Sequence, residues 1–346
     1  MKKINIAIIG YGGMGAYHAH NLIESGLYNV FAYDILPGRL EAAKRDGLKI
    51  YDSYQQAAQD SQLDAVLIAT PNDSHRFYTE YFAAAGKHII CEKPVTTSSK
   101  ELEAMLAAVK NHGVKFVVHQ NRRWDTDYLM VKDIMKSNVI GGVYRLESKV
   151  VGSRGVPGEW RKIKEKGGGM MLDWGVHLID QLLLMTDSKI KNLYCEMSYT
   201  LGFEVDDGFK LLLEFEDGLR AEIVVDTNCL VDVPRWIVYG MEGSAVIKNW
   251  QLEGEILLPL FEDLAKIKGE QAGNGFTKTM ARRSGIEKKD LPEIRVEPYV
   301  FYKHFYDVLI NEAECVIKNE QVMRVMLVME AAFKSALNKR VLEVNL

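Results

Sequence analysis

A short apolar run followed directly by a glycine-rich turn constrains the fold of this chain more than any other feature. Residues Ile4–Ile9 have the length of a buried strand, and Gly10, Gly12 and Gly15 follow in the spacing G-x-G-x-x-G. The first glycine permits a tight turn, the second lets the backbone approach a pyrophosphate, and the third allows close packing of strand and helix. The N-terminus of that helix offers N–H groups to phosphates. The motif therefore predicts a dinucleotide-binding unit.

An acidic residue about twenty positions after the glycine loop supports this prediction. Asp34 closes the apolar segment Val30–Tyr33, the expected second strand. A carboxylate at this place accepts hydrogen bonds from the adenosine ribose hydroxyls and repels a 2′-phosphate. NAD is therefore expected in preference to NADP. Arg39 is the counter-evidence, because it could reach a phosphate; it is interpreted as a surface residue of the next helix.

The first third of the chain alternates strand and helix signals, which is typical of a parallel sheet covered by helices. Further apolar strands are expected at Leu63–Ala69, Lys87–Cys91 and Lys115–His119. Ligands of such sheets bind beyond the carboxyl ends of the strands. The expected cofactor contacts are therefore the glycine loop and residues close to these strand ends: Gly10, Gly12, Gly13, Met14, Gly15, Asp34, Thr70, Pro71, Asn72, His75, Glu92, Lys93 and Gln120.

A second group of chemically active residues lies on an apolar segment after Gly167–Gly169. Its large apolar residues recur at helical spacing and predict a buried helix. Asp173, His177 and Asp180 are spaced to project from one face of it. We expect Gly175 to let a flat group approach the backbone between the first two. Ionisable groups are costly to bury unless paired or used, so the segment is interpreted as an active-site helix. The alternative is an Asp–His pair that is satisfied in the core or lies at the surface.

The remainder of the chain has a different pattern of secondary-structure signals. A helix is expected at Asp125–Ser137, strands dominate from Val143 onward, and two helices are expected at about Tyr299–Ile317 and Gln321–Leu337. Residues 251–296 are expected to form a loop. The predicted fold is an α/β Rossmann domain (residues 1–121) joined to an α+β domain (residues 122–346) with a large open, mostly antiparallel sheet. Alternating apolar residues are expected on an outward face that packs against a second copy, giving a homodimer or homotetramer; they are Leu211, Leu213, Ile223 and Val225.

Composition excludes several classes of protein. The chain has 346 residues, 47% hydrophobic and 26% charged, with a net charge of −4 and a pI near 6.1. These values give no reason to expect binding to nucleic acid or to a membrane. The apolar run after Lys3 is too short for a signal peptide, and the four cysteines lie far apart, so a cytoplasmic protein without a metal site is expected. His18 and His20 are expected at the surface or in packing roles.

The paired motifs resemble those of the glucose-fructose oxidoreductase / inositol dehydrogenase / rhizopine-catabolism (Gfo/Idh/MocA) family. The resemblance rests on the glycine loop, Glu92-Lys93-Pro94 at a strand end and the Gly-Gly-Gly…Asp-x-Gly-x-His-x-x-Asp segment, and it covers essentially the whole chain. It implies nicotinamide-dependent oxidation or reduction of a sugar or polyol. It also implies that Lys93, Asp173 and His177 are the catalytic residues.

The chemistry of alcohol oxidation suits these residue types. A neutral histidine can accept the hydroxyl proton at physiological pH, and a lysine can stabilise the developing alkoxide. Sequence alone leaves open which of His177 and Lys93 takes the proton; we favour His177. Three alternatives are kept: an inositol 2-dehydrogenase, a redox-neutral glycosidase or lyase with tightly bound NAD, and a non-catalytic dinucleotide-binding regulator.

The favoured substrate is a hexoside oxidised at the C3 hydroxyl, by resemblance to glycoside 3-dehydrogenase-like members. Two loops near the domain junction carry aromatic and charged residues of the kinds that bind sugars. The expected substrate contacts from these loops and the catalytic segments are Lys93, Arg122, Arg123, Asp125, Arg154, Trp160, Arg161, Asp173 and His177.

Overall fold

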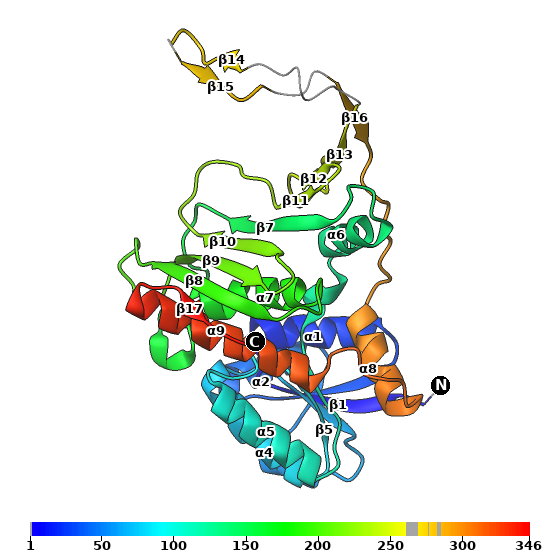
Figure 1. Cartoon of the computed structure of the whole chain (residues 1–346). Coiled ribbons are helices and arrows are strands. Elements are labelled where there is room, and N and C mark those ends of the chain that lie inside the picture. Colours follow the sequence, from blue (N-terminus) through cyan, green and yellow to red (C-terminus); the bar gives the residue numbers. More distant parts are fainter. Residues whose placement is uncertain (1, 261–268, 276, 282–284) are drawn as a thin grey trace.

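A computed structural model describes residues 2–260, 269–275, 277–281 and 285–346 of the chain. Two β-sheets form separate halves of the molecule, with the helices α7 (Val176–Leu183) and α9 (Asn319–Asn338) between them (Figure 1). The two helices contact each other, α7 contacts strand β10 (Arg220–Asp226) of the second sheet, and α9 contacts strand β8 (Ile190–Ser198) of that sheet and helix α5 (Ser99–Asn111) of the N-terminal half. They thus cover one face of the second sheet and join it to the N-terminal half.

The N-terminal sheet is parallel throughout, with the strand order β3-β2-β1-β4-β5-β6. The strand order reverses between β1 and β4, which opens a crevice at the carboxyl ends of these strands. This arrangement confirms the predicted Rossmann domain. Its strands are β1 (Ile4–Ile9), β2 (Tyr28–Tyr33), β3 (Lys49–Ile50), β4 (Ala65–Ile68), β5 (His88–Cys91) and β6 (Phe116–Val118). Its helices are α1 (Gly13–Glu24), α2 (Pro37–Arg45), α3 (Tyr54–Gln59), the 3-10 turn η1 (Asn72–Ser74), α4 (His75–Ala84) and α5 (Ser99–Asn111).

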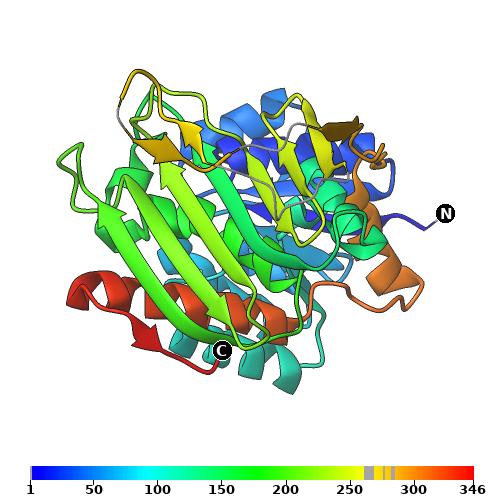
Figure 2. The same ribbon diagram turned by 45° about the horizontal axis from the view of Figure 1, so that its top comes forward.

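The second sheet has the strand order β16-β13-β12-β11-β7-β10-β9-β8-β17 and is open (Figure 2). Only the pair β7–β10 is parallel among its described pairs, so the mostly antiparallel sheet is confirmed. Its strands are β7 (Val143–Val151), β8 (Ile190–Ser198), β9 (Gly208–Phe215), β10 (Arg220–Asp226), β11 (Trp236–Gly240), β12 (Ser244–Ile247), β13 (Gly254–Pro259), β16 (Ile286–Lys289) and β17 (Leu342–Glu343). The helical segments before α7 are η2 (Asn121–Trp124), α6 (Thr126–Ser137), η3 (Trp160–Lys162), η4 (Lys164–Lys166) and the π-helical turn η5 (Met171–Gly175).

The C-terminal helices tie the two halves together. Helix α8 (Val300–Ile310) packs on the Rossmann domain, where Tyr28 Oη donates to the Tyr302 carbonyl at 2.6 Å. On α9, the Glu330 carboxylate accepts hydrogen bonds from the Ser99 N–H at 2.6 Å and the Ser99 hydroxyl at 2.8 Å. These contacts join the C-terminal part of the chain to the N-terminal domain and thereby stabilise the junction between the two domains.

The interpretation of residues 251–296 as a loop is wrong for part of the described segment. Strands β13 and β16 pair there and extend the second sheet, and β14 (Glu270–Gln271) and β15 (Lys278–Thr279) form a further small hairpin. The extension projects away from the body of the molecule (Figure 1). Residues 261–268, 276 and 282–284 of this segment lie outside the described residues.

The prediction that alternating apolar residues form an outward face of the second sheet is also wrong. Leu211, Leu213, Ile223 and Val225 are at most 3% exposed, and they belong to the core on the face of the sheet that the helices cover. The opposite face carries Leu212, Val224 and ion pairs such as Lys210–Glu222 at 3.1 Å. The alternation of apolar residues was identified correctly. The apolar side faces the helices because burial of these side chains against them stabilises the sheet. Homodimer or homotetramer formation stays a prediction, which light scattering can test.

None of the helices among the described residues is both long enough and apolar enough to cross a membrane.

Candidate active site

The glycine loop forms a backbone cradle at the carboxyl end of β1. Gly10 has φ +97°, and a Cβ there would lie 2.9 Å from the Ala69 carbonyl oxygen, while a Cβ on Gly15 would lie 2.0 Å from the Gly10 carbonyl oxygen. These two positions require glycine because of local packing. At Gly12 and Gly13 no described atom lies within 4 Å of the Cβ position. The loop is therefore open where a phosphate has to approach the helix N-terminus.

A cavity of about 770 Å³ runs from this cradle to the start of α7. Of the residues expected to bind cofactor, the cavity is lined by Gly10, Gly12, Gly13, Met14, Asp34, Thr70, Pro71, Asn72, Glu92 and Lys93. Lys93, Asp173 and His177, the expected catalytic residues, line its other end. The cavity thus brings the two motifs together, although they are far apart in the sequence.

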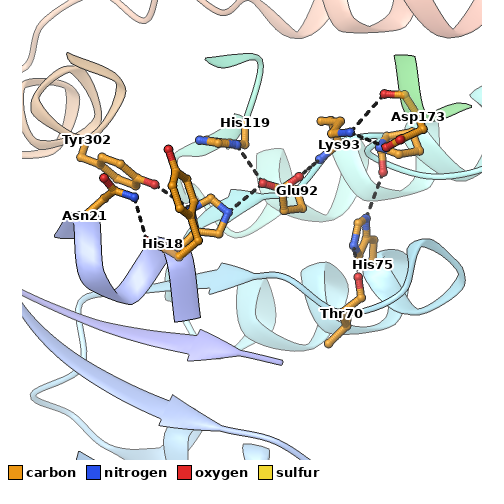
Figure 3. A network of polar contacts seen from close by, with 11 residues as sticks. His18, Asn21, Thr70, His75, Glu92, Lys93, His119, Asp173 and Tyr302 are labelled. Carbon is orange, nitrogen blue, oxygen red and sulfur yellow. Dashed lines mark hydrogen bonds and ion pairs between the residues drawn. The ribbon is translucent and has the colours of Figure 1, made fainter. Parts of the chain in front are cut away.

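Lys93 and Asp173 form the central ion pair of the cavity. Lys93 Nζ lies 2.9 Å from Asp173 Oδ1 and also donates to the Asp173 carbonyl at 3.1 Å (Figure 3). Arg161 Nε lies 3.1 Å from the other carboxylate oxygen. Burial raises the pKa of Asp173, but the charges of Lys93 and Arg161 outweigh burial, and the net pKa is lowered. Asp173 is therefore ionised and holds the lysine ammonium in place.

A π-helical turn places Asp173. The Met171 N–H donates to Asp206 Oδ2 at 2.7 Å, and the Asp173 N–H donates to the Gly169 carbonyl at 3.0 Å. Gly169 has φ +104°, and a Cβ there would lie 2.2 Å from Asp206 Oδ1. Burial raises the pKa of Asp206 to about 6. Asp206 was not predicted as a site residue, because its contact with residue 171 depends on how β9 packs under the turn.

Gly175 does not serve the purpose expected of it. It is buried, and a Cβ there would lie 2.7 Å from Met171 Sδ and 3.2 Å from the Phe209 ring. The glycine therefore allows the π-helical turn to pack on the second sheet, and it does not open the backbone to a ligand.

His177 is the buried imidazole of the cavity. It is 4% exposed, and its Nδ1 has no hydrogen-bond partner among the described residues. Burial lowers its pKa well below the usual value, and the neighbouring charges of Lys93 and Arg122 lower it further. The imidazole is therefore neutral at physiological pH, the form in which a histidine can accept a proton.

A buried polar network lies beside Lys93 (Figure 3). Glu92 Oε1 is 2.7 Å from His18 Nε2 and 2.8 Å from His119 Nδ1, and Glu92 Oε2 accepts the Lys93 N–H at 2.9 Å. The second nitrogen of His18 is 2.8 Å from the Tyr302 hydroxyl. Burial raises the pKa of Glu92, but the two histidines outweigh it and lower that pKa well below its usual value. The carboxylate therefore fixes the backbone from which the Lys93 side chain extends.

His18 and His20, both expected at the surface or in packing roles, differ in their relation to this network. His18 is completely buried in it through polar contacts, whereas His20 is exposed. His18, Glu92 and His119 are close enough together to serve as metal ligands. However, their direct contacts at 2.7 and 2.8 Å use the nitrogens that an ion would need. The geometry favours a hydrogen-bonded triad.

Three of the expected cofactor contacts do not line the cavity. Gly15 packs beneath the loop, and Gln120 is 1% exposed. His75 is completely buried, with Nε2 2.9 Å from the Thr70 carbonyl and Nδ1 3.1 and 3.2 Å from the Pro94 and Val95 carbonyls. It therefore joins the two strand-end loops that carry cavity residues.

The expected substrate residues separate into three groups. Arg122, Trp160 and Arg161 line the cavity with the catalytic residues. Arg154 lines a second, adjoining cavity. Asp125 instead accepts from Arg122 at 2.8 Å and lines neither cavity.

Arg123 and Asp180 lie away from the cavity. The Arg123 guanidinium donates to both Asp180 carboxylate oxygens, at 2.7 and 2.8 Å, and to the Val316 carbonyl and Gln321 Oε1, both at 2.8 Å. Arg123 is buried in these contacts and lines neither cavity, so the structure does not bring it together with the other expected substrate residues. The sequence analysis expected Asp180 on the same face of the helix as Asp173 and His177. Asp180 instead pairs with Arg123 and neutralises its charge away from the cavity.

Several cavity residues were missed by the sequence analysis. They include Tyr33, Ile35, Leu36, His119 and Trp174. Trp174 lies inside the Asp-x-Gly-x-His segment itself, so its position in the motif was a usable signal. The others follow strand ends already identified, but sequence does not show which of their side chains turn inward.

Comparison with known proteins decides the family. Residues 4–120 match the model described as "Oxidoreductase family, NAD-binding Rossmann fold", and residues 128–246 match the Gfo/Idh/MocA C-terminal domain. The chain belongs to the Gfo/Idh/MocA oxidoreductase family. The resemblance identified from the motifs is thereby confirmed, and the protein is an NAD(P)-dependent oxidoreductase.

Relatives within the Gfo/Idh/MocA family include two inositol dehydrogenases. The scyllo-inositol 2-dehydrogenase (NADP(+)) IolW of Bacillus subtilis is 24% identical, over 98% of this chain and 96% of its own. The myo-inositol 2-dehydrogenase of Thermotoga maritima is 22% identical, over 91% and 88%. A crystal structure of an NAD-binding protein from Listeria innocua is 43% identical, covers 99% of this chain and 97% of its own, and has a TM-score of 0.88.

Proposed function

We propose that this protein oxidises a ring secondary alcohol of a sugar or glycoside to the ketone, or catalyses the reverse reduction, with the C3 hydroxyl of a hexoside as the reacting group. The observation that supports this proposal is that Lys93, Asp173 and His177 line the same cavity as the open glycine loop. A paired ammonium and a neutral, unpartnered imidazole are suited to a hydroxyl group that has to lose a proton.

The residues present fit a nicotinamide dinucleotide. The open backbone at Gly12 and Gly13 would hold the pyrophosphate, Asp34 would hold the adenosine ribose, and the strand-end residues Thr70 to Asn72 and Glu92 would lie along the rest. When bound, the nicotinamide accepts or returns the hydride. His177 takes the hydroxyl proton on a ring nitrogen. Lys93, held by Asp173, stabilises the negative charge that develops on the substrate oxygen.

NAD is the cofactor we propose. Asp34 lines the cavity, and its carboxylate accepts the Tyr11 N–H at 2.7 Å and the Leu36 N–H at 2.8 Å, which holds it at the end of β2. A carboxylate fixed there repels a 2′-phosphate. Arg39 lines the same cavity, and IolW is named as an NADP(+) enzyme, so the two cofactors have to be compared directly.

An inositol 2-dehydrogenase is the second candidate. Two relatives that align with most of this chain favour it, since both are named inositol 2-dehydrogenases. A cyclitol also presents a ring secondary hydroxyl, so the same catalytic residues would serve.

The test is to incubate the purified protein with NAD or NADP and a panel of methyl glycosides, disaccharides and inositols, and to follow absorbance of the reduced cofactor. We expect NAD to be reduced with glycosides, and we expect Asp34→Ala to weaken NAD binding by about tenfold while improving use of NADP. Cofactor reduction by inositols alone would select the second candidate.

Two further outcomes of the same test would contradict the proposal. If glycosides bind and their products change without net cofactor reduction, the protein is a redox-neutral glycosidase or lyase. If NAD binds and none of the panel reacts, the proposed substrate class is wrong and a dinucleotide-binding regulator becomes the favoured alternative. A preference for NADP that Asp34→Ala leaves unchanged would contradict the cofactor assignment.

A further inference from the structure

A second cavity of about 540 Å³ adjoins the first and shares Arg122 and Trp174 with it. Its walls come from the end of β7 and the loop that follows, from the end of β10, and from Trp250 after β12. It therefore opens beside the catalytic residues but extends away from the glycine loop. A substrate placed over Lys93 and His177 could continue into it.

The aromatic side of this second cavity is built from two tryptophans. The ring centres of Trp174 and Trp250 are 6.0 Å apart, and their planes meet at 41°. The Arg122 guanidinium carbon is 4.2 Å from the Trp174 ring centre, and the Arg235 guanidinium carbon is 5.0 Å from that of Trp250. Arg235 is 3% exposed and paired with Asp127 at 3.1 Å. Trp250 is thus in contact with a buried cation although the residue is 46% exposed.

The charges around the second cavity favour a neutral occupant. Arg122 is neutralised by Asp125 at 2.8 Å, and Arg154 lines the cavity together with Asp226. An anion would gain from Arg154 but would be repelled by Asp226. A group with many hydroxyls can use both, because it donates to a carboxylate and accepts from a guanidinium.

We propose that the second cavity is a subsite for the non-reacting sugar ring of a two-ring glycoside. The apolar C–H face of that ring lies on Trp250 and Trp174, and its hydroxyls bond to Arg154 and Asp226. The ring that is oxidised lies over Lys93 and His177. This inference rests on the proposed function and narrows its substrate class: a free inositol or a methyl glycoside fills only the first cavity.

The test measures binding, so it needs no turnover. Isothermal titration in the presence of reduced NAD compares a disaccharide of two glucose units with methyl glucoside. We expect the wild type to bind the disaccharide at least about tenfold more tightly. Trp250→Ala is expected to remove most of that difference while changing the affinity for methyl glucoside by less than about threefold. Tyr144→Ala, an exposed aromatic residue on β7 outside both cavities, is the matched control.

Three results would overturn the subsite. They are equal binding of the two sugars by the wild type, an equal effect of Trp250→Ala on both, and no effect on either. If thermal unfolding shows that Trp250→Ala is unfolded, the exposed Arg154→Ala takes its place with the same expectation. A wild type that shows the expected binding pattern but reduces no NAD would refute the proposed oxidation and leave the subsite standing.

Discussion

Buried histidines make the stability of the protein depend on pH. Burial is the largest cause that lowers the pKa of His75, His119 and His177. Below the unfolded pKa of about 6.5, the unfolded chain binds protons that the folded chain does not, so stability is present above that pH and is lost as pH falls. Each such histidine contributes a slope of about 1.4 kcal/mol per pH unit.

We therefore predict that the free energy of unfolding, measured with denaturant, falls between about pH 7 and pH 5. His177→Gln is expected to make this slope shallower by about one proton. His20→Gln, at an exposed position on α1, is the control and leaves the slope unchanged. A stability that rises over this interval, or a slope unaffected by His177→Gln, would contradict the account.

Individual residues of the candidate site differ in how far the sequence predicted them. Asp173 and His177 were identified from helical spacing on an apolar segment, because such spacing is visible in the chain itself. Lys93 as a catalytic residue came from the resemblance to a family, since a single lysine at a strand end carries little information. The triad of His18, Glu92 and His119 was not predicted. Its members are dispersed along the chain, and only the packed domain brings them together.

At the scale of elements, the active-site helix is the informative case. The apolar periodicity predicted one helix, whereas the structure has the π-helical turn η5 followed by α7. Periodicity does not distinguish a π turn from an α turn over five residues, and π turns occur often at functional sites. The cause lies outside the segment, in Asp206 and Phe209, which contact the turn.

Gly175→Ala tests the importance of this turn. An added Cβ would meet Met171 Sδ and the Phe209 ring in a buried place, so we expect a loss of about 1–3 kcal/mol in the free energy of unfolding and a lower kcat. Thermal and denaturant unfolding measure the first, and the cofactor assay the second. Gly38→Ala on α2, where no described atom is within 4 Å, is the control for stability. A Gly175→Ala protein as stable and active as the wild type would show that the turn does not depend on this glycine.

At the scale of the whole molecule, the two-domain plan was predictable and two features were not. Alternating strands and helices predicted the Rossmann domain, and runs of strands predicted the open sheet. The strands within residues 251–296 were missed because β16 (Ile-Glu-Lys-Lys) has no apolar alternation and forms only through its pairing with β13. The direction of the apolar face of the second sheet depends on where α7 and α9 pack, which short-range patterns do not contain.

We propose that Lys93 and His177 act on one substrate hydroxyl beside the nicotinamide. The direct measurement is the rate of NAD reduction with the best glycoside for the wild type, Lys93→Met and His177→Gln, together with the affinity of each for NAD. We predict that each variant loses about a thousandfold or more in kcat while its NAD affinity changes by less than about threefold. A variant that keeps more than about a tenth of the wild-type kcat would contradict the role assigned to that residue.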